Sequence, residues 1–366
     1  MGYKMKEKYY SLDKIKKLDA DYNIIIGERS NGKTYACLEN ILHDYINLGY
    51  QGAYIRRWRE DIIGKRAETL FNAFCENGMI RKLTHDKYDN VIYTKSAWHL
   101  AKYDNDKHKM IADKNPFCYA FSLSESEHDK STSYPKIQNI VFDEFLTRRY
   151  YLPDEFIIFA NVLSTIIRDR DSIKIYMLGN TVNKYCPYFA EMGLHNIAAQ
   201  LQGTIDIYTL DNLKIAVEYC GNKTAKKSNK YFAFNNQRLR MVTSGQWELA
   251  IYPHLPIGHK IKKDSILFNF VISFNSQLIQ GDIVLDNMGY YIYMHNRTNT
   301  NLDNVIVYTL DYTPSNFTRK CFLYPRDKID NNIKNIFACK KVFYQSNDIG
   351  ELVHNYLLSV IKAGNV

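Results

Sequence analysis

Apolar positions in the first 200 residues fall into two kinds of run. Short continuous runs, typical of strands buried on both faces, cover residues 22–26, 52–57, 136–142 and 173–178. Helical spacing is found over residues 9–20, from the end of the first run to about residue 48, and over 60–80 and 155–168. Strands that alternate with helices predict a parallel α/β sheet, whose site lies at the carboxyl ends of the strands.

The pattern differs outside this core of alternating elements. Strands at 91–94 and 117–121 flank a polar excursion at 102–114, and residues 221–230 are lysine-rich, as in a linker or an exposed loop. Beyond them the pattern predicts strands at 266–274, 281–285, 289–294 and 305–310 and a closing helix at 349–363. We therefore predict a first domain over residues 1–200, a linker region over 201–235, and a smaller α+β domain over 236–366.

A glycine motif follows the first strand and opens the first long helix. It fits G-x-x-x-x-G-K-[ST] and consists of Gly27, Glu28, Arg29, Ser30, Asn31, Gly32, Lys33 and Thr34. Its glycines allow backbone N–H groups to face phosphate oxygens, and the helix N-terminus favours negative charge. We expect Lys33 to contact the β- and γ-phosphates of a nucleotide and Thr34 to coordinate Mg²⁺. A glycine turn that binds nothing is the alternative, which the strand–loop–helix context disfavours.

Two carboxylates end the apolar strand before them. Asp143 is placed as a Walker B aspartate that holds Mg²⁺, and Glu144 is placed to polarise an attacking water. The pair predicts hydrolysis rather than transfer to a bound acceptor, and a solvated strand end is the plain alternative. The guanine-reading pattern N-K-x-D is absent, because Cys186 stands at the aspartate position after Asn183. ATP is therefore the expected nucleotide.

Hydrolysis also needs positive charge at the developing γ-phosphate, often from a neighbouring subunit. The candidates are Arg168 and Arg170, at the end of the next predicted helix, and the pair Arg148 and Arg149. Ordinary surface or helix-terminal charges are an equal alternative for all four. Asn180, at the end of the following strand, is a candidate for binding the γ-phosphate or its water, although a lone asparagine more often forms a turn.

Composition narrows the class of protein. The chain has 366 residues, 46% hydrophobic and 24% charged, which excludes a collagenous or disordered chain. No apolar run reaches the length of about 18 residues that a membrane helix needs. The 7 cysteines form no CxxC pair, so we expect reduced thiols. Met1–Lys6 lacks the motifs of a signal peptide or a myristoyl anchor, and no membrane association is expected.

The charge balance points toward a polyanionic partner. The formal net charge is +9. Residues 1–200 hold 29 basic and 26 acidic residues, and residues 201–366 hold 19 and 13, so the excess is larger in the second part. Nucleic acid is one such partner, and simple solubility is the alternative explanation.

The combination of these motifs resembles a known family. It is similar to the DNA-packaging ATPase of small tailed phages, the phi-29-like motor subunit, which is a divergent relative of large terminases within the ASCE class of P-loop NTPases. Many families share the P-loop, whereas the full set in this order is more specific and covers about residues 20–190. The matching segments are Ile24–Thr34, Tyr54–Arg57, Ile140–Phe145, Ile166–Arg170 and Leu178–Asn180, with Asn183, Pro187 and Tyr188.

The resemblance implies a motor. It implies a homo-oligomeric ring, expected to be a pentamer, that docks on the portal of a procapsid in the host cytoplasm and threads double-stranded DNA into it. A structural RNA is a further candidate partner. By its motif, Arg168 is implied to be an arginine finger that acts in trans, and Lys130 a second residue that reaches the neighbouring nucleotide. Arg56 and Arg57 are implied to act near the nucleotide or in coupling.

The resemblance also implies that the second domain is RNase H-like, a nuclease fold that has lost its activity in this branch. Two-metal cleavage needs carboxylates that converge from adjacent strands, and Phe270–Asn275 carries none. Asp282, Asp286 and Asp311 remain, and Asp286 before Asn287 is typical of a turn. We therefore expect a vestigial domain that binds without cleaving.

DNA held through its phosphates needs lysines but no base-reading motif. Candidate grip residues in the polar excursion are Lys102, Lys107, Lys109 and Lys114, and simple solvation is their alternative role. Two other functions stay open: a different ring NTPase that acts on nucleic acid, such as a helicase or a plasmid-transfer ATPase, and a nucleotide-dependent scaffold without turnover.

Overall fold

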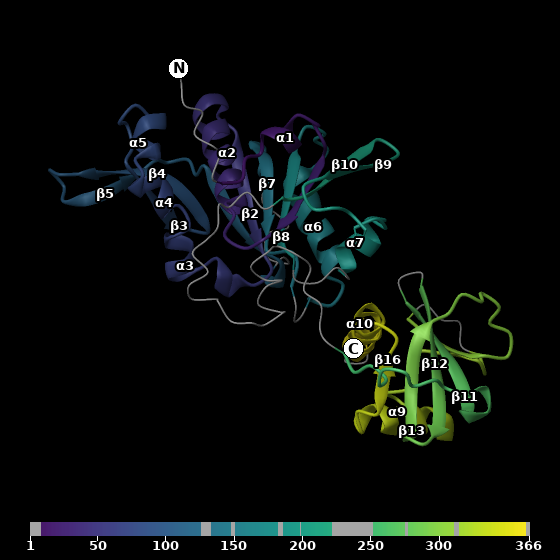
Figure 1. Cartoon of the computed structure of the whole chain (residues 1–366). Coiled ribbons are helices and arrows are strands. Elements are labelled where there is room, and N and C mark those ends of the chain that lie inside the picture. The colour runs from purple at the N-terminus through teal and green to yellow at the C-terminus, as the bar shows by residue number, and fades with distance from the viewer. Residues whose placement is uncertain are drawn as a thin grey trace. The chain divides into compact units, whose positions relative to one another are not determined.

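The protein consists of two compact units, Met1–Glu248 and Leu249–Val366 (Figure 1). The computed structural model describes residues 9–125, 133–147, 151–181, 186–197, 199–221, 252–274, 277–310 and 315–363. Within these ranges no helix is both long and apolar enough to cross a membrane.

The first unit is built on a 10-stranded sheet in the order β3-β4-β6-β2-β7-β8-β1-β10-β9, with β5 paired to β4. Neighbouring strands from β6 to β10 in this order are parallel, and the strands at both edges are antiparallel to their neighbours. The strands are β1 (Tyr22–Gly27), β2 (Gln51–Arg56), β3 (Asn90–Thr94), β4 (Ala97–Asp104), β5 (Lys109–Ala112), β6 (Cys118–Ser122), β7 (Ile137–Asp143), β8 (Lys174–Asn180), β9 (Ile205–Leu210) and β10 (Leu213–Tyr219).

Helices cover both faces of this sheet (Figure 1). Consecutive residues of β1 face opposite sides, so Ile24 and Ile26 join one apolar cluster and Ile25 joins the other. This two-sided burial explains why β1 is apolar at nearly every position. One cluster contains residues of α6 (Glu155–Ile167) and α7 (Pro187–Glu191), and the other contains residues of α1 (Asp13–Lys16), α2 (Lys33–Leu48), α3 (Gly64–Glu68), α4 (Asn72–Glu76) and α5 (Met79–Leu83).

Most of the predicted elements of the first unit are confirmed, and four stretches differ. The helix predicted over residues 9–20 is a single turn, α1. Residues 60–80 form a 3-10 turn at Arg59–Asp61 and three short helices instead of one long helix. The polar excursion at 102–114 carries the β4–β5 hairpin. Residues 205–219 form β9 and β10, and β10 pairs in parallel with β1. The first unit therefore extends past the predicted boundary at residue 200, because this hairpin completes its sheet. The predicted linker residues 222–235 lie outside the described ranges.

The second unit contains a mixed sheet in the order β15-β14-β11-β12-β13-β16. The strands β11, β12 and β13 form an antiparallel meander, and β14 lies parallel to β11. This arrangement confirms a smaller α+β domain after a larger parallel α/β domain. Its elements are β11 (Ile266–Phe274), β12 (Gln277–Asp286), β13 (Gly289–Asn296), β14 (Ile306–Thr309), β15 (Thr318–Arg319), α9 (Lys328–Ala338), β16 (Val342–Tyr344) and α10 (Asn347–Ala363), with a 3-10 turn at Lys263–Ser265.

Two of the candidate acidic residues of the second unit, Asp282 and Asp286, form hydrogen bonds with groups of the same unit. Asp282 accepts hydrogen bonds from Gln280 and His295, and Asp286 accepts one from the backbone N–H of Met288, as its predicted turn role requires. No group of three or more potential metal ligands occurs among the residues that the structure describes, and Asp311 is not one of these. Loss of nuclease activity stays a prediction.

We predict that Gly281→Ala destabilises the second unit by about 1–3 kcal/mol. A Cβ atom at Gly281 would overlap the ring of Phe270, which is fully buried. Thermal unfolding measures the effect. Leu285→Ala, at an exposed position on the same strand, is the control and should change stability by less than about 0.5 kcal/mol. Equal stability of the two variants would contradict the tight Gly281–Phe270 packing.

Candidate nucleotide site

The glycine motif connects β1 to α2 and forms one wall of a cavity of about 650 Å³. Gly32 has φ of 97°, a left-handed conformation that a side chain rarely adopts, and α2 begins at the next residue. The backbone N–H groups at the start of α2 lack partners within the helix and can therefore bind phosphate. The other walls come from the ends of β7 and β8, as a parallel sheet predicts.

Lys33 is the central cation of the cavity. Its ammonium group donates to the Glu28 carbonyl at 2.7 Å and to Asn31 Oδ1 at 3.2 Å, and it lies 3.5 Å from Asn180 Oδ1. The register of β1 and β8 places Asn180 opposite Gly27, which brings Asn180 to the site. Burial lowers the pKa of Lys33, and nearby Asp143 opposes this shift. Lys33 and Asn180 thus lie together, as expected.

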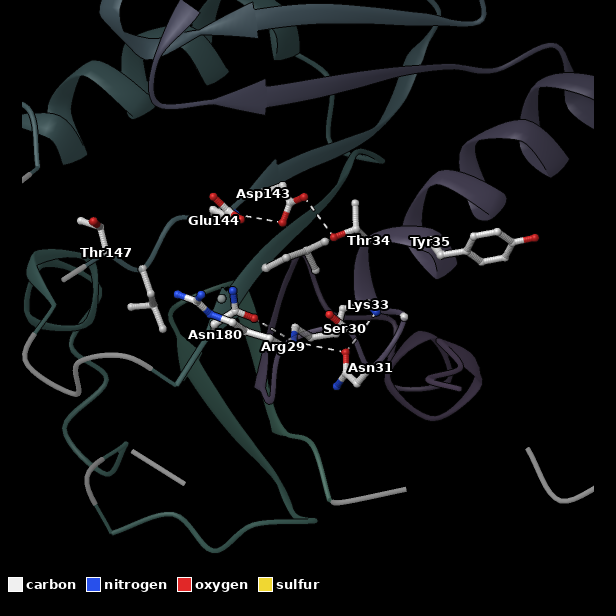
Figure 2. Close-up of a pocket in the computed structure, with 14 residues that line it drawn as sticks. Arg29, Ser30, Asn31, Lys33, Thr34, Tyr35, Asp143, Glu144, Thr147 and Asn180 are labelled. Atoms are coloured by element: carbon white, nitrogen blue, oxygen red, sulfur yellow. Dashed lines mark hydrogen bonds between the residues drawn. The ribbon is translucent and has the colours of Figure 1, made fainter. Parts of the chain in front are cut away.

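The carboxylate of Asp143 collects three hydrogen bonds. Its Oδ2 accepts from the Thr34 hydroxyl at 3.0 Å and from the Tyr54 hydroxyl at 2.8 Å, and its Oδ1 accepts from the Glu144 backbone N–H at 2.9 Å. Figure 2 shows Asp143 between Thr34 and Glu144. One carboxylate beside one hydroxyl fits Mg²⁺, which takes few protein ligands and completes its shell with phosphate and water.

Tyr54 is a site residue that the sequence did not single out. It lies within the apolar run of β2 and is almost fully buried. Burial and the neighbouring Asp143 raise the pKa of Tyr54, so its hydroxyl stays protonated and donates to Asp143. The sequence feature that could have identified Tyr54 is its hydroxyl, which lies within an apolar run two residues before Arg56.

Glu144 lies at the mouth of the cavity and is held by an arginine. It has φ of 57°, and its side chain is 55% exposed. Its Oε2 forms an ion pair with Arg56 Nη2 at 2.6 Å. Arg56 also contacts Asp61 at 3.2 Å and lies 3.9 Å from Asp143. Arg56 is thus near the site, as expected, but binds its carboxylates and does not line the cavity.

Arg57 does not line the cavity, and its predicted role near the nucleotide or in coupling stays a prediction. It is 5% exposed, and its Nε and Nη2 bind Glu155 at 2.7 and 2.9 Å. Its guanidinium also donates to the backbone carbonyls of Glu144 at 3.2 Å and Phe145 at 2.6 Å. Arg56 is the last residue of β2 and Arg57 follows it, and the two side chains bind different partners. Arg57 therefore joins the turn after β7 to the start of α6, to which Glu155 belongs.

Arg168 lies far from the cavity of its own chain. It is exposed and directly follows α6. Its neighbour Arg170 donates to the carbonyl of Ile137 at the start of β7, whereas Asp143 ends that strand. A strand of this length spans roughly 20 Å, beyond the reach of one side chain. The other predicted cations, Lys130, Arg148 and Arg149, lie outside the described residues.

The candidate grip lysines are distributed around the β4–β5 hairpin, which extends away from the sheet (Figure 1). Lys102 donates to the carbonyl of Asp86 at 2.8 Å, and Lys107 forms an exposed ion pair with Asp104 at 3.3 Å. Lys109 is also exposed, and Lys114 lies in the following turn. Their role in binding DNA stays a prediction.

Comparison with known proteins gives the family. The model of the podovirus DNA encapsidation protein (Gp16) family matches residues 4–344 of the chain. The chain belongs to the Gp16 family. The match extends into the second unit and so covers more of the chain than the motifs between residues 20 and 190.

Three relatives of this Gp16-family chain are named DNA packaging proteins. Those of Bacillus phages PZA and phi29 are each 26% identical over 187 residues, and that of Bacillus phage B103 is 27% identical over 186 residues. The alignments with PZA and phi29 cover 50% of this chain and 50% of each relative. The chain therefore spans about half the length of the curated relatives it matches.

Two solved structures share the fold over nearly the whole Gp16-family chain. One is the bacteriophage Phi-29 viral genome packaging motor assembly, with a TM-score of 0.60, 18% identity, and coverage of 97% of this chain and 100% of that chain. The other is the Phi-28 gp11 DNA packaging motor, with a TM-score of 0.55, 19% identity, and coverage of 97% and 98%. At these identities the likeness establishes the fold.

We predict that Glu155→Gln destabilises the first unit by about 3–5 kcal/mol, because it leaves the buried charge of Arg57 without its partner. Glu125→Gln is a matched control. It breaks an ion pair with Arg59 of the same length, 2.7 Å, but on the surface, and should cost less than about 1 kcal/mol. Denaturant unfolding of both variants measures the difference, and similar losses would show that burial of the Arg57–Glu155 pair does not matter.

Proposed function

We propose that the chain is the ATP-hydrolysing subunit of a phage DNA-packaging motor. The observation that carries the proposal is the joining of Thr34, Asp143 and Glu144 at the mouth of a phosphate-binding loop. A hydroxyl and a carboxylate at hydrogen-bonding distance, with a second carboxylate next in sequence, form the arrangement that NTP hydrolysis uses. Membership of the Gp16 family supports DNA packaging as the work that hydrolysis drives.

Each residue of the site has a role in this proposal. The N–H groups of Arg29–Thr34 bind the phosphates, and Lys33 exchanges its carbonyl and amide partners for phosphate oxygens. Thr34 and Asp143 hold Mg²⁺, which when bound neutralises charge on the β- and γ-phosphates. Glu144 accepts the proton of the attacking water once its carboxylate leaves Arg56. Asn180, which lies beside Lys33, binds the γ-phosphate or the water.

Assembly into a ring completes the site. Arg168 lies at the opposite end of β7 from Asp143, so it serves the nucleotide of an adjacent subunit rather than its own. Head-to-tail contacts that place each subunit against the next close into a ring, and we expect a pentamer. Lys130 is proposed as a second residue that reaches across this contact.

The partners of the ring follow from the family. We propose that it docks on the portal of a procapsid in the host cytoplasm and moves double-stranded DNA, with a structural RNA as a further candidate. The excess of basic residues in residues 201–366 suits contact with nucleic acid through phosphates. The second unit is proposed to dock and bind without cleaving.

We predict that wild-type protein hydrolyses ATP faster when DNA is added and that Glu144→Gln lowers turnover by about 10²–10⁴-fold, because a general base is lost. ATP binding should persist, since the P-loop is unchanged. Steady-state phosphate release and binding of a fluorescent ATP analogue measure the two effects, and Glu125→Gln should behave as wild type. Turnover that DNA does not change, or that Glu144→Gln does not lower, would refute the motor. Strand separation on forked DNA would favour a helicase, and binding without turnover a scaffold.

We predict that Arg168→Ala subunits, which alone keep only residual turnover, recover turnover when mixed with Lys33→Ala subunits. In a mixed ring, the intact P-loop of one subunit meets the intact Arg168 of the other. The measurement is ATP turnover against mixing ratio, with each variant alone as the control. A mixture no more active than its components would exclude Arg168 as an arginine finger in trans.

A further inference from the structure

Arg170 holds together two segments that are far apart in sequence. Its guanidinium has five N–H groups, and the structure gives each an acceptor. Nε donates to the carbonyl of Ile167 at 2.9 Å, and Nη2 donates to those of Ile166 at 2.5 Å and Tyr134 at 3.1 Å. Nη1 donates to the carbonyls of Pro135 at 3.0 Å and Ile137 at 2.6 Å. Arg170 therefore uses its whole donor set on backbone, and it is unsuited to contact a neighbour's phosphate.

These five carbonyls belong to two structural positions. Ile166 and Ile167 form the last turn of α6, where carbonyls lack partners within the helix and the helix dipole favours a cation. Tyr134, Pro135 and Ile137 form the chain that enters β7. Arg170 thus fixes the end of α6 to the entrance of the strand that carries Asp143 at its other end.

The turn between α6 and Arg170 is strained. Arg168 has φ of 35° and Asp169 has φ of 44°, in a region that residues with side chains seldom occupy. Such conformations cost about 1–3 kcal/mol each and persist only where surrounding contacts enforce them. Arg170 follows directly after both residues, and its five hydrogen bonds supply that enforcement. The direction in which the Arg168 side chain extends from the surface is therefore determined by the hydrogen bonds of Arg170.

We propose that Arg170 is a positioning residue that aims Arg168 at the nucleotide of the adjacent subunit. This role rests on the proposed function, since it presupposes that Arg168 acts in trans. The two arginines of the R-x-R motif then have different roles. Arg168 is exposed and reaches the adjacent subunit, and Arg170 fixes the turn that carries Arg168. Lysine cannot replace Arg170, because a single ammonium offers three donors from one point and cannot span both segments.

The test compares Arg170→Ala and Arg170→Lys in the full chain, assayed for DNA-stimulated ATP turnover. Both should lower kcat by about 100-fold, the loss expected from a misplaced group, and leave KM for ATP within about twofold of wild type. Arg81→Ala is the matched control, because Arg81 is exposed and lies 3.7 Å from its carboxylate partner Asp89. It should behave as wild type. Unchanged kcat in both Arg170 variants would overturn the proposal.

Two further measurements separate positioning from a general structural effect. Arg170→Ala subunits mixed with Lys33→Ala subunits should recover turnover, as Arg168→Ala subunits do, because their own nucleotide site is intact. The double variant Arg168→Ala/Arg170→Ala should be no slower than Arg168→Ala, because Arg170 acts only through Arg168. A further loss in the double variant, or no recovery in the mixture where Arg168→Ala recovers, would overturn the proposal. If Arg170→Ala fails to fold, Arg170→Lys carries the same three measurements.

The outcomes also distinguish this role from the motor itself. If wild type and Arg81→Ala show no DNA-stimulated turnover, the proposed function fails and the role of Arg170 fails with it. If both show it and the Arg170 variants match them, the motor stands and only the positioning role is wrong.

Discussion

The nucleotide site depends on one carboxylate, that of Asp143, which accepts hydrogen bonds from α2, from β2 and from the turn after β7. Asp143 ends β7. It accepts hydrogen bonds from the hydroxyl of Thr34 on α2, the hydroxyl of Tyr54 on β2 and the backbone N–H of Glu144. This meeting is possible because β1, β2, β7 and β8 lie side by side in parallel, so that their carboxyl ends share one edge. A shift of one residue in the register of β2 would move Tyr54 to the other face of the sheet and remove its bond to Asp143.

Four arginines of this unit, Arg56, Arg57, Arg168 and Arg170, have the same side chain but different roles. The groups that surround each one in the fold determine its role. Arg56 binds the side chain of Glu144, and Arg57, which directly follows β2, binds the backbone of the same turn together with Glu155. Glu155 begins α6, and the turn of Arg168 and Arg170 ends it. Arginines thus hold α6 at both ends, because Arg57 binds Glu155 in its first turn and Arg170 binds the carbonyls of its last turn.

Local sequence predicted the elements that its own pattern encodes. The apolar runs predicted β1, β2, β7 and β8, and the motif at Gly27–Thr34 predicted the phosphate loop, because these features rest on neighbouring residues. It did not predict β9 and β10, because the place of β10 beside β1 depends on pairing across nearly 200 residues and β9 pairs only with β10. Nor did it predict that residues 60–80 form three short helices instead of one long helix. These helices pack their apolar residues into one cluster on one face of the sheet.

The sequence by itself determined the chemistry available to this protein: a phosphate loop, two consecutive carboxylates after a strand, and arginine pairs at fixed places in the chain. Only the tertiary structure decided what the arginines do. Arg57 meets Glu155 98 positions away, and Arg170 meets Ile137 33 positions away. A guanidinium looks the same in every sequence, and its role depends on which acceptors the fold brings within hydrogen-bonding distance.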